Sequence, residues 1–375
     1  MKVMIIMGTR PEAIKLAPVI SEAKNRSGNI ELIICSTGQH KEMLNQALSV
    51  FNISPDIELD IMRENQTLTD LTSRLLDALS KVISENKPDV VVVQGDTTSA
   101  FSAALAAFYL HIPVAHVEAG LRTGNMESPF PEELNRVMIG RIAHWHFAPT
   151  SQSKDNLLNE GIESKDILVT GNTVVDAIEM IRSTWEVQPS KEDLPNYFPG
   201  KDLILITTHR RENFGRGLEQ ICLAIRTLCA RFTDYGFIFP VHMNPQVRQV
   251  VFELLDGIDN LQLIEPVDFN TCLYLQSQVR LIITDSGGIQ EEAPSFSVPT
   301  VVVREATERG EGINQGFAIL AGVDANSIIQ AAENYLNDED IIVHLSKKAN
   351  PYGDCLAGKR IISKLLDEPM EAFNG

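Results

Sequence analysis

Long hydrophobic runs are absent from this chain of 375 residues. A helix that crosses a membrane needs about 18 or more consecutive apolar residues, whereas the apolar stretches here have the length of single strands. The N-terminal run from Val3 to Met7 is also too short for a secretory signal peptide. We therefore expect a cytoplasmic protein that has no membrane partner.

Positive charge is also scarce. The chain has 32 lysine and arginine residues against 50 aspartate and glutamate residues, so its formal net charge is −18 at pH 7. Proteins that bind nucleic acid or anionic membranes present a basic surface, and we expect neither partner. An anionic ligand would have to bind where a few basic side chains gather locally.

Cysteine is rare, and its spacing does not match any metal-binding pattern. The five cysteines form no CxxC pair and are not interleaved with histidine. We expect no metal site, and we expect all five thiols to be buried and inert. They are Cys35, Cys222, Cys229, Cys272 and Cys355.

Short runs rich in β-branched residues alternate with amphipathic stretches along the chain. This alternation is typical of a parallel sheet covered by helices, and it restarts in the second half. We predict an α/β protein of two doubly wound, Rossmann-like domains, residues 1–170 and 171–353, with the ligand in a cleft at the carboxyl ends of their strands. The predicted strands are Lys2–Met7, Glu31–Ser36, Asp89–Gln94, Ile112–Val117, His146–Ala148, Ile167–Thr170, Asp202–Thr207, Gly236–Pro240, Leu261–Ile264, Arg280–Thr284 and Thr300–Val303.

The glycine-rich nucleotide loops GxGxxG and GxxxxGK[ST] are missing, so dinucleotide and P-loop interpretations lose their main support. The first strand instead leads into Gly8-Thr9 at the start of a helix. Free N–H groups favour an anion at such a position, and Arg10 and Lys15 add positive charge. An ordinary strand-to-helix turn would explain the same residues.

Two carboxylates follow neighbouring strands of the first domain. Asp96 comes after the strand that ends at Gln94, and Glu118 comes after the strand that ends at Val117. A single helical connection usually makes two such strands neighbours, and two carboxylates at one site can share acid and base work. Asp96 alone would equally suit a helix N-cap, and Glu118 a surface ion pair.

Pro131 begins another helix, with Glu132 and Glu133 in its first turn. Glutamates are common there because they complement the helix dipole. Successive helical residues point about 100° apart, so at most one of the two should reach the cleft. Arg122 and Arg136 flank this segment and could neutralise a phosphate.

The second domain has its own candidates for binding phosphate. His209-Arg210-Arg211 follows the first strand of that domain and could bind an anion, although a solvated charge run would look the same. Ser286-Gly287-Gly288 lies between a strand and a helix start, where glycine permits close backbone approach. Glu292 could accept hydrogen bonds from ribose hydroxyls, and Arg309 is a further cation. These features suggest a nucleotide whose other half meets acid and base groups.

Several specific strings occur in order along nearly the whole chain, and together they resemble the non-hydrolysing UDP-N-acetylglucosamine 2-epimerases. The resemblance implies a glycosyltransferase-B-like fold, a C-terminal helix in residues 354–375 that packs back on the first domain, and a homodimer. It also implies conversion of UDP-N-acetylglucosamine to UDP-N-acetylmannosamine for surface polysaccharide synthesis, without a cofactor or metal. The strings are MGTRPEAIKLAPVI, GQHKEML, GDTTSAFSAALAAFY, HVEAGLRTGNMESPFPEELNR, FAPTSQSKDNLL, TGNTVVDA, HRRENFGRGLEQIC, PVHMNP, DSGGIQEEAPS, TERGEG and NPYGD.

The resemblance also implies roles for individual residues. Its matching motifs place the catalytic carboxylates at Asp96, Glu118 and Glu132, with His209 near the diphosphate. It implies elimination of UDP to a 2-acetamidoglucal followed by re-addition, and it leaves open which carboxylate serves which face of C2. The matching nucleotide-binding positions are Arg10, Lys15, Ser286, Gly288, Glu292 and Arg309.

Three positions depart from the family pattern. Gln94 stands where members often have histidine, Cys272 where the residue near the uracil is often aromatic, and Gly310 where proline is usual. These changes concern base packing and loop stiffness rather than the class of reaction.

Bacterial relatives often bind a second UDP-N-acetylglucosamine as an activator. The matching positions here are Gln39, Arg210 and His242, together with a glutamine and an arginine that are replaced by Glu42 and Asn65. Since these changes remove one cation and add one anion beside a diphosphate, we expect weak activation and near-hyperbolic kinetics.

Three alternatives remain open at this point. A nucleotide-sugar glycosyltransferase of the same fold would need an acceptor site, and a hydrolysing epimerase would release free UDP. A non-catalytic UDP-sugar-binding regulator would tolerate amide replacements at the three carboxylates.

Overall fold

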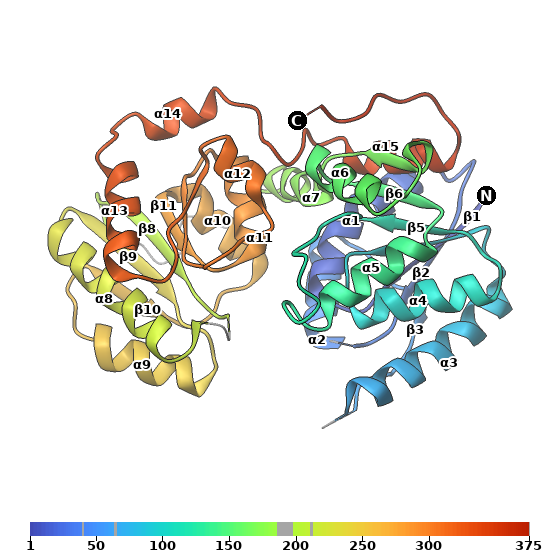
Figure 1. Cartoon of the computed structure of the whole chain (residues 1–375), viewed down its shortest axis with the longest axis horizontal. Coiled ribbons are helices and arrows are strands. Elements are labelled where there is room, and N and C mark those ends of the chain that lie inside the picture. The colour runs from blue at the N-terminus through green and yellow to red at the C-terminus, as the bar shows by residue number, and fades with distance from the viewer. Residues whose placement is uncertain (40, 64–65, 186–197, 211–212, 375) are drawn as a thin grey trace. The chain divides into compact units, whose positions relative to one another are not determined.

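The computed structural model describes residues 1–39, 41–63, 66–185, 198–210 and 213–374. These residues form two units, the first comprising Met1–Ser183 and Tyr352–Gly375 and the second comprising Thr184–Pro351. Each unit is built on a parallel sheet covered by helices, which confirms the predicted fold class (Figure 1). No helix in the described ranges is long and apolar enough to cross a membrane.

The sheet of the first unit has the strand order β3-β2-β1-β4-β5-β6-β7, and every pairing is parallel. Gln94 at the end of β4 pairs with Val117 at the end of β5, so the carboxyl ends of these two strands lie side by side. The edge strand β3 was not predicted, because a strand of two residues shows no pattern. The strands are β1 (Lys2–Met7), β2 (Glu31–Ser36), β3 (Ile57–Glu58), β4 (Val90–Gln94), β5 (Val114–Val117), β6 (Trp145–Ala148) and β7 (Ile167–Val169).

Helices cover this sheet in two groups. One group packs α3 (Leu68–Asn86) and α5 (Glu132–Ile142) against α4 (Thr98–Tyr109). The other packs α2 (Lys41–Val50), α7 (Thr173–Arg182) and α15 (Ala357–Leu365) against α1 (Arg10–Asn25). Because both faces are covered, a central strand such as β4 is apolar at successive positions. The helix α6 (Ser151–Asn159) contacts β6 and β7, and a 3₁₀ turn precedes β7 at Ser164–Asp166.

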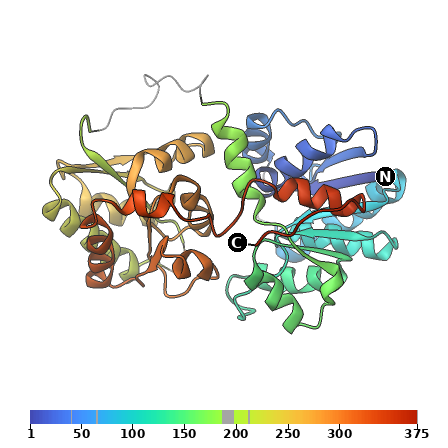
Figure 2. The same ribbon diagram turned by 90° about the horizontal axis from the view of Figure 1, so that it is seen from above.

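The boundary between the units lies after Ser183, later than the expected boundary at residue 170. The reason is α7, whose apolar residues Val174, Ile178 and Ile181 are buried in the first unit. The C-terminal helix α15 lies on the same unit (Figure 2). There Arg360 forms an ion pair with Asp354 at 2.6 Å.

The sheet of the second unit is again parallel, in the order β10-β9-β8-β11-β12-β13. Its strands are β8 (Asp202–Thr207), β9 (Tyr235–Pro240), β10 (Leu261–Ile264), β11 (Val279–Thr284), β12 (Thr300–Val302) and β13 (Ala318–Leu320). Its helices are α8 (Arg216–Arg231), α9 (Pro245–Leu255), α10 (Phe269–Gln278), α11 (Gly287–Glu292), α12 (Gly310–Asn314), α13 (Ala325–Leu336) and α14 (Ile341–Ser346), with a 3₁₀ turn at Ala293–Phe296.

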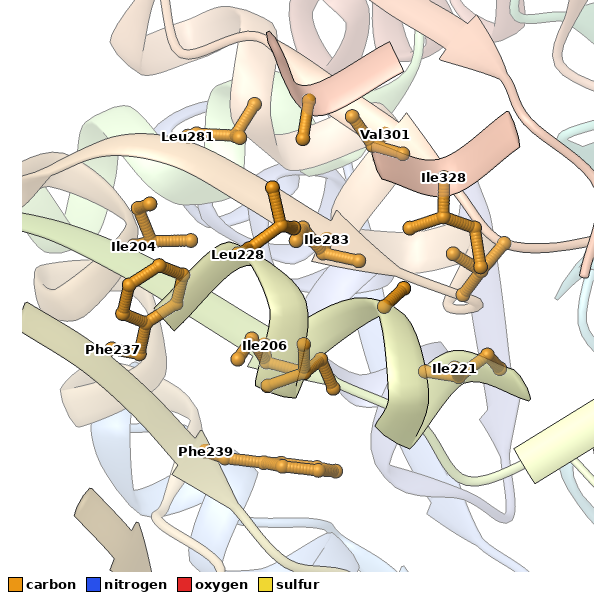
Figure 3. Packing of buried hydrophobic residues seen from close by; sticks show 14 of the residues in the cluster. Ile204, Ile206, Ile221, Leu228, Phe237, Phe239, Leu281, Ile283, Val301 and Ile328 are labelled. Carbon is orange, nitrogen blue, oxygen red and sulfur yellow. The ribbon is translucent and has the colours of Figure 1, made fainter. Parts of the chain in front are cut away.

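A large apolar core fills one face of the second sheet. Figure 3 shows Ile221 and Leu228 of α8 against Ile206 of β8 and Phe237 of β9, all fully buried. Helices α9 and α13 supply residues to the same cluster, whereas α10 and α11 pack with the residues of the opposite face. The loops at the strand ends of this sheet therefore extend from a well-packed core.

The expectation of five buried cysteines was wrong in part. Cys35, Cys222 and Cys229 are buried, and burial raises the pKa of each thiol to about 12. Cys355 is exposed and Cys272 is half-buried. Cys355 lies in the segment by which the chain returns to the first unit, directly before α15.

Candidate active site

Glu12 fills the turn between β1 and α1. Its carboxylate accepts hydrogen bonds from the backbone N–H groups of Gly8 at 2.9 Å and Thr9 at 2.7 Å, and from the Thr9 hydroxyl at 2.8 Å. These two amides are therefore used within the chain rather than open to an external anion. Burial raises the pKa of the Glu12 carboxyl, and the hydrogen bonds oppose that shift. Arg10, by contrast, is exposed and has no ion-pair partner among the described residues.

Glu118 lies directly after β5, in a left-handed backbone conformation with φ of +66°. The Nζ atom of Lys15 is 2.5 Å from Glu118 Oε2, and Gln94 Nε2 donates to the same oxygen at 2.9 Å. The side chains of Lys15 and Glu118 are only 11% and 10% exposed. Lys15, which was expected among the UDP ligands, is thus the partner of a candidate catalytic carboxylate.

Asp96 lies beside Glu118, at the end of the neighbouring strand β4. Its Oδ2 atom is 2.5 Å from Arg136 Nη2, and its backbone carbonyl accepts a hydrogen bond from Asn135 Nδ2 at 2.9 Å. His116, which is fully buried, donates to the Gly95 carbonyl at 2.8 Å, and burial lowers the pKa of this histidine to about 3. The N-cap alternative for Asp96 was wrong, because the next residue caps α4 instead.

The structure separates the two glutamates of α5. Glu133 is buried and accepts hydrogen bonds from the backbone N–H groups of Thr123 at 3.0 Å and Gly124 at 2.9 Å. Glu132 is half-buried and has no hydrogen-bond or ion-pair partner in the described part of the chain. Glu133 therefore holds the preceding loop, and only Glu132 is left with a carboxylate that can meet a ligand.

Both arginines that flank this segment are paired within the chain. Arg122 binds Glu160 with two nitrogens, at 2.7 and 2.9 Å. Arg136 is buried, with Asp96 on one side and Glu133 at 3.3 Å on the other. These guanidinium groups balance carboxylates, so neither stands as an unpaired cation for a phosphate.

In the second unit, Asp285 organises the loop that follows β8. This fully buried carboxylate accepts hydrogen bonds from Thr208 Oγ1 at 2.8 Å, from the backbone N–H groups of His209 and Arg210 at 3.0 Å, and from Asn213 Nδ2 at 3.0 Å. Burial alone would raise the pKa of Asp285, but the contacts from His209 and the other donors outweigh it and the pKa is lowered. The backbone of His209 and Arg210, which the sequence suggests for phosphate binding, is therefore held by the Asp285 carboxylate.

The second glycine-rich segment starts α11. Ser286 caps the helix, and a Cβ atom at Gly287 would lie 2.6 Å from Arg309 Cζ, so a larger residue there would have to displace the Arg309 guanidinium group. Arg309 in turn forms ion pairs with Glu291 at 2.9 Å and with Glu308. Its charge is balanced within the unit, and its side chain forms a wall of the glycine turn.

Glu292 lies one turn further along α11. Its Oε2 atom accepts a hydrogen bond from Gln276 Nε2 at 2.6 Å, and a Cβ atom at Gly288 would lie 3.3 Å from its Oε1 atom. Gln276 also lies 3.8 Å from the Cys272 sulfur. Gln276 thus connects Cys272, at the position that the family resemblance places near the uracil, with Glu292, at a position that it assigns to nucleotide binding.

Two of the expected activator residues lie together in the second unit. The rings of His209 and His242 stack with centroids 6.1 Å apart, and burial and His209 lower the pKa of His242. Arg210 Nε donates to the Asp285 carbonyl at 3.1 Å. Both activator candidates therefore border the candidate catalytic histidine.

The other activator position lies in the first unit. Gln39 accepts a hydrogen bond from the Ser99 hydroxyl at 2.7 Å. The Glu42 side chain and residues Asn65 and Arg211 lie outside the described residues.

Sequence reasoning missed the buried carboxylates that hold these loops. Glu12 follows Thr9 by three residues, which is the spacing of a capping box, so its role in the turn could have been found. Asp285 follows β11 directly, beside β8, and could have been found from the predicted neighbourhood of those strands. In the described ranges no group of three or more histidine, cysteine, aspartate or glutamate side chains is placed to hold a metal ion.

A sequence model of the family described as UDP-N-acetylglucosamine 2-epimerase matches residues 22–366 of this chain. The chain belongs to the UDP-N-acetylglucosamine 2-epimerase family. It is similar to the UDP-N-acetylglucosamine 2-epimerase of Yersinia pestis, with 46% identity over 370 residues, which is 97% of this chain and 98% of that protein. It is also similar to the enzyme of Escherichia coli K12, with 45% identity over 372 residues, which is 97% of this chain and 98% of that protein.

Solved structures of epimerases of this family are also similar. The Neisseria meningitidis enzyme bound to UDP-GlcNAc has a TM-score of 0.92 at 44% identity, covering 98% of this chain and all of that one. The Methanocaldococcus jannaschii enzyme in complex with UDP-GlcNAc and UDP has a TM-score of 0.83 at 36% identity, with the same coverage. A glycotransferase of kitacinnamycin, at 11% identity with a TM-score of 0.66, covers 97% of this chain and 99% of that one, and it shows the shared fold alone. The protein is therefore an epimerase of the isomerase class, and its two Rossmann-like units belong to a glycosyltransferase-B-like fold.

Proposed function

We propose that this epimerase inverts C2 of UDP-N-acetylglucosamine to give UDP-N-acetylmannosamine, and catalyses the reverse reaction. The observation that carries the proposal is the placement of Asp96 and Glu118 at the ends of neighbouring strands, each with a basic partner. Glu132 supplies a third carboxylate without such a partner in the described chain. A reaction that removes a proton on one face and delivers one on the other needs at least two proton-transfer groups.

The chemistry must take account of the position of C2, which is not next to a carbonyl, so simple enolisation is unavailable. A carboxylate removes the C2 proton while the bond from C1 to the UDP oxygen breaks. The C2–H electron pair becomes the C1=C2 double bond of a 2-acetamidoglucal, and the C1–O pair leaves with UDP. UDP then adds back to C1, and a carboxylic acid delivers a proton to the other face of C2. The cycle consumes no oxidant or reductant.

The second unit is proposed to bind the UDP moiety. His209 follows β8, and Ser286, Gly287 and Gly288 follow β11, the neighbouring strand of the same sheet. Positive groups near the diphosphate would stabilise the charge that grows on it as it leaves, which is often the largest single contribution to catalysis. We also propose a cytoplasmic homodimer that supplies surface polysaccharide synthesis, testable by cell fractionation and light scattering.

Amide substitutions test the catalytic part of this proposal. Asp96→Asn, Glu118→Gln and Glu132→Gln should each lower kcat by about a hundredfold or more, because general acid–base catalysis contributes about that much. Affinity for UDP should stay within a few-fold. Glu127→Gln, at an exposed glutamate in the loop before α5, is the matched control and should keep normal turnover.

The outcomes separate the alternatives. Near-normal turnover in one amide variant would remove that residue from the catalytic set. Retained function in all three would favour a non-catalytic UDP-sugar-binding regulator. Accumulation of free UDP in step with product would indicate a hydrolysing epimerase, and a requirement for an acceptor would indicate a glycosyltransferase.

A further inference from the structure

Glu12 connects two turns of the first unit that both lie at the carboxyl ends of strands. Its side chain is fully buried, at 0% exposure. One carboxylate oxygen, Oε2, accepts the three hydrogen bonds from Gly8 and Thr9 in the turn after β1. The other, Oε1, accepts a hydrogen bond from Thr97 Oγ1 at 2.7 Å. Thr97 is the residue next to Asp96, in the turn after β4.

All four of these contacts use Glu12 as an acceptor. Thr97 Oγ1 itself accepts a hydrogen bond from the Ala100 N–H at 3.0 Å, so its proton is free to be donated to Glu12. The Gly8 and Thr9 N–H groups can only donate. A glutamine at residue 12 would turn its NH₂ group either toward the N–H groups of Gly8 and Thr9, which cannot accept, or toward the Thr97 hydroxyl, which could accept only by giving up its own donation. The site therefore favours a carboxylate over a neutral amide of the same shape, which would break or reverse one of these contacts.

The turn that carries Asp96 is fixed from several elements, and Glu12 is the contribution of α1. His116 of β5 holds the Gly95 carbonyl, and α5 holds Asp96 through Asn135 and Arg136. On α1, Lys15 follows Glu12 by three residues, on the same face of the helix, and it contacts Glu118. One turn of α1 thus touches both Glu118 and the turn of Asp96.

We propose that Glu12 is a positioning residue of the epimerase, which sets the place of Asp96 relative to Glu118 through the Glu12–Thr97 hydrogen bond. The inference rests on the proposed catalytic role of Asp96. Glu12 itself touches no substrate in this account. A displacement of the Asp96 turn by about 1 Å would lower turnover by roughly ten- to a hundredfold, while the UDP contacts of the second unit would stay as they are.

The chain offers a matched control in α3. Thr67 and Asp70 form a capping box of the same spacing, in which Asp70 accepts hydrogen bonds from the backbone N–H and hydroxyl of Thr67. That box is exposed, and the hydrogen bonds of its two side chains stay within its own turn. Asp70→Asn and Thr67→Val therefore remove a cap from the same unit without touching the Asp96 turn.

The experiment measures kcat, KM and UDP affinity for Glu12→Gln, Thr97→Val, their double variant and the α3 controls. We expect Glu12→Gln and Thr97→Val each to lower kcat at least tenfold, with KM and UDP affinity within about threefold. The double variant should be no slower than the slower single variant, because both changes disrupt the same Glu12–Thr97 hydrogen bond. Thr97→Ser, which keeps the hydroxyl, should restore turnover, and the α3 variants should keep it.

A purely structural role would give a different pattern. Glu12→Gln and Thr97→Val would then lower the melting temperature, leave the kcat of the folded enzyme unchanged, and combine additively; that result would overturn the inference. If Glu12→Gln does not fold, the comparison of Thr97→Val with Thr97→Ser still decides, since equal turnover in both would refute positioning through this bond. A wild-type protein without epimerase activity would instead refute the proposed function.

Discussion

Asp176 lies on α7 and faces the start of the C-terminal helix α15. Its Oδ1 atom accepts a hydrogen bond from the Gly358 N–H at 2.9 Å, whereas its buried Oδ2 atom has no partner among the described residues. Burial raises the pKa of this carboxyl from 3.8 to about 6, against the lowering effect of the α15 N–H groups. The charge on Asp176 at neutral pH therefore destabilises the folded protein relative to the unfolded chain.

The magnitude follows from the shift in pKa. Two units at 1.36 kcal/mol per unit correspond to about 3 kcal/mol of unfolding free energy. Above pH 6 the side chain is charged in both states, so the folded state carries the full penalty. As the pH falls from 6 toward 3.8, the folded protein takes up this proton before the unfolded chain does, and stability rises. Between pH 7.5 and pH 4.5 the gain from this group is about 2 kcal/mol.

We predict that Asp176→Asn removes this pH dependence. The variant should gain stability relative to the parent at pH 7.5, and this relative gain should be smaller at pH 4.5 by about 2 kcal/mol. Urea unfolding can be followed in a Trp185→Phe background, where Trp145 in β6 is the sole remaining tryptophan of the two and reports on the first unit. Glu179→Gln, at an exposed position of the same helix, is the control and should show no such difference. A stability difference that is the same at both pH values would refute the reasoning.

Two further predictions concern the loops at the strand ends. Asp285→Asn should destabilise the second unit by about 1–3 kcal/mol, because the charge is lost and an NH₂ group replaces Oδ1, the oxygen that lies 3.1 Å from His209 Nδ1. The pKa of Asp285 is lowered in the folded protein, so the difference from the parent should shrink as the pH falls below the usual value of 3.8. Unfolding followed by Trp185 checks both expectations. Gly8→Ala should destabilise the first unit by about 1–3 kcal/mol, because the added Cβ would lie 2.3 Å from Thr37 Oγ1 and 2.4 Å from Ser99 Oγ; unchanged Trp145 unfolding would show that the turn can relax.

The fold could largely be predicted because its signals are local. Strand β1 and strand β8 have the predicted bounds, Lys2–Met7 and Asp202–Thr207, since each is an apolar run bounded by polar residues. The edge strand β3 spans only two residues and has no such pattern, whereas β13 lies in the apolar run Phe317–Ala321 and was overlooked. The placement of α7 in the first unit depends on which surface its apolar side packs against, and no local pattern contains that information.

The candidate site could be predicted in its carboxylates but not in its pairings. Asp96 and Glu118 lie near each other because their strands are neighbours, which chain connectivity already suggests. The partner of Arg122 is Glu160, 38 residues along the chain, and Arg309 is balanced by Glu291 and Glu308. Such ion pairs form only through tertiary packing. Arginines that the sequence suggests as phosphate ligands are therefore already paired with carboxylates of the chain.

The central claim is that C2 loses its hydrogen to solvent during inversion, and exchange in D₂O tests it most directly. The protein is incubated with UDP-N-acetylglucosamine in D₂O without added nucleotide cofactor, and C2 is followed by NMR. The account predicts that UDP-N-acetylmannosamine forms with deuterium at C2, and that recovered UDP-N-acetylglucosamine also acquires deuterium there as the reaction reverses. Inversion with the original hydrogen fully retained at C2 would contradict it.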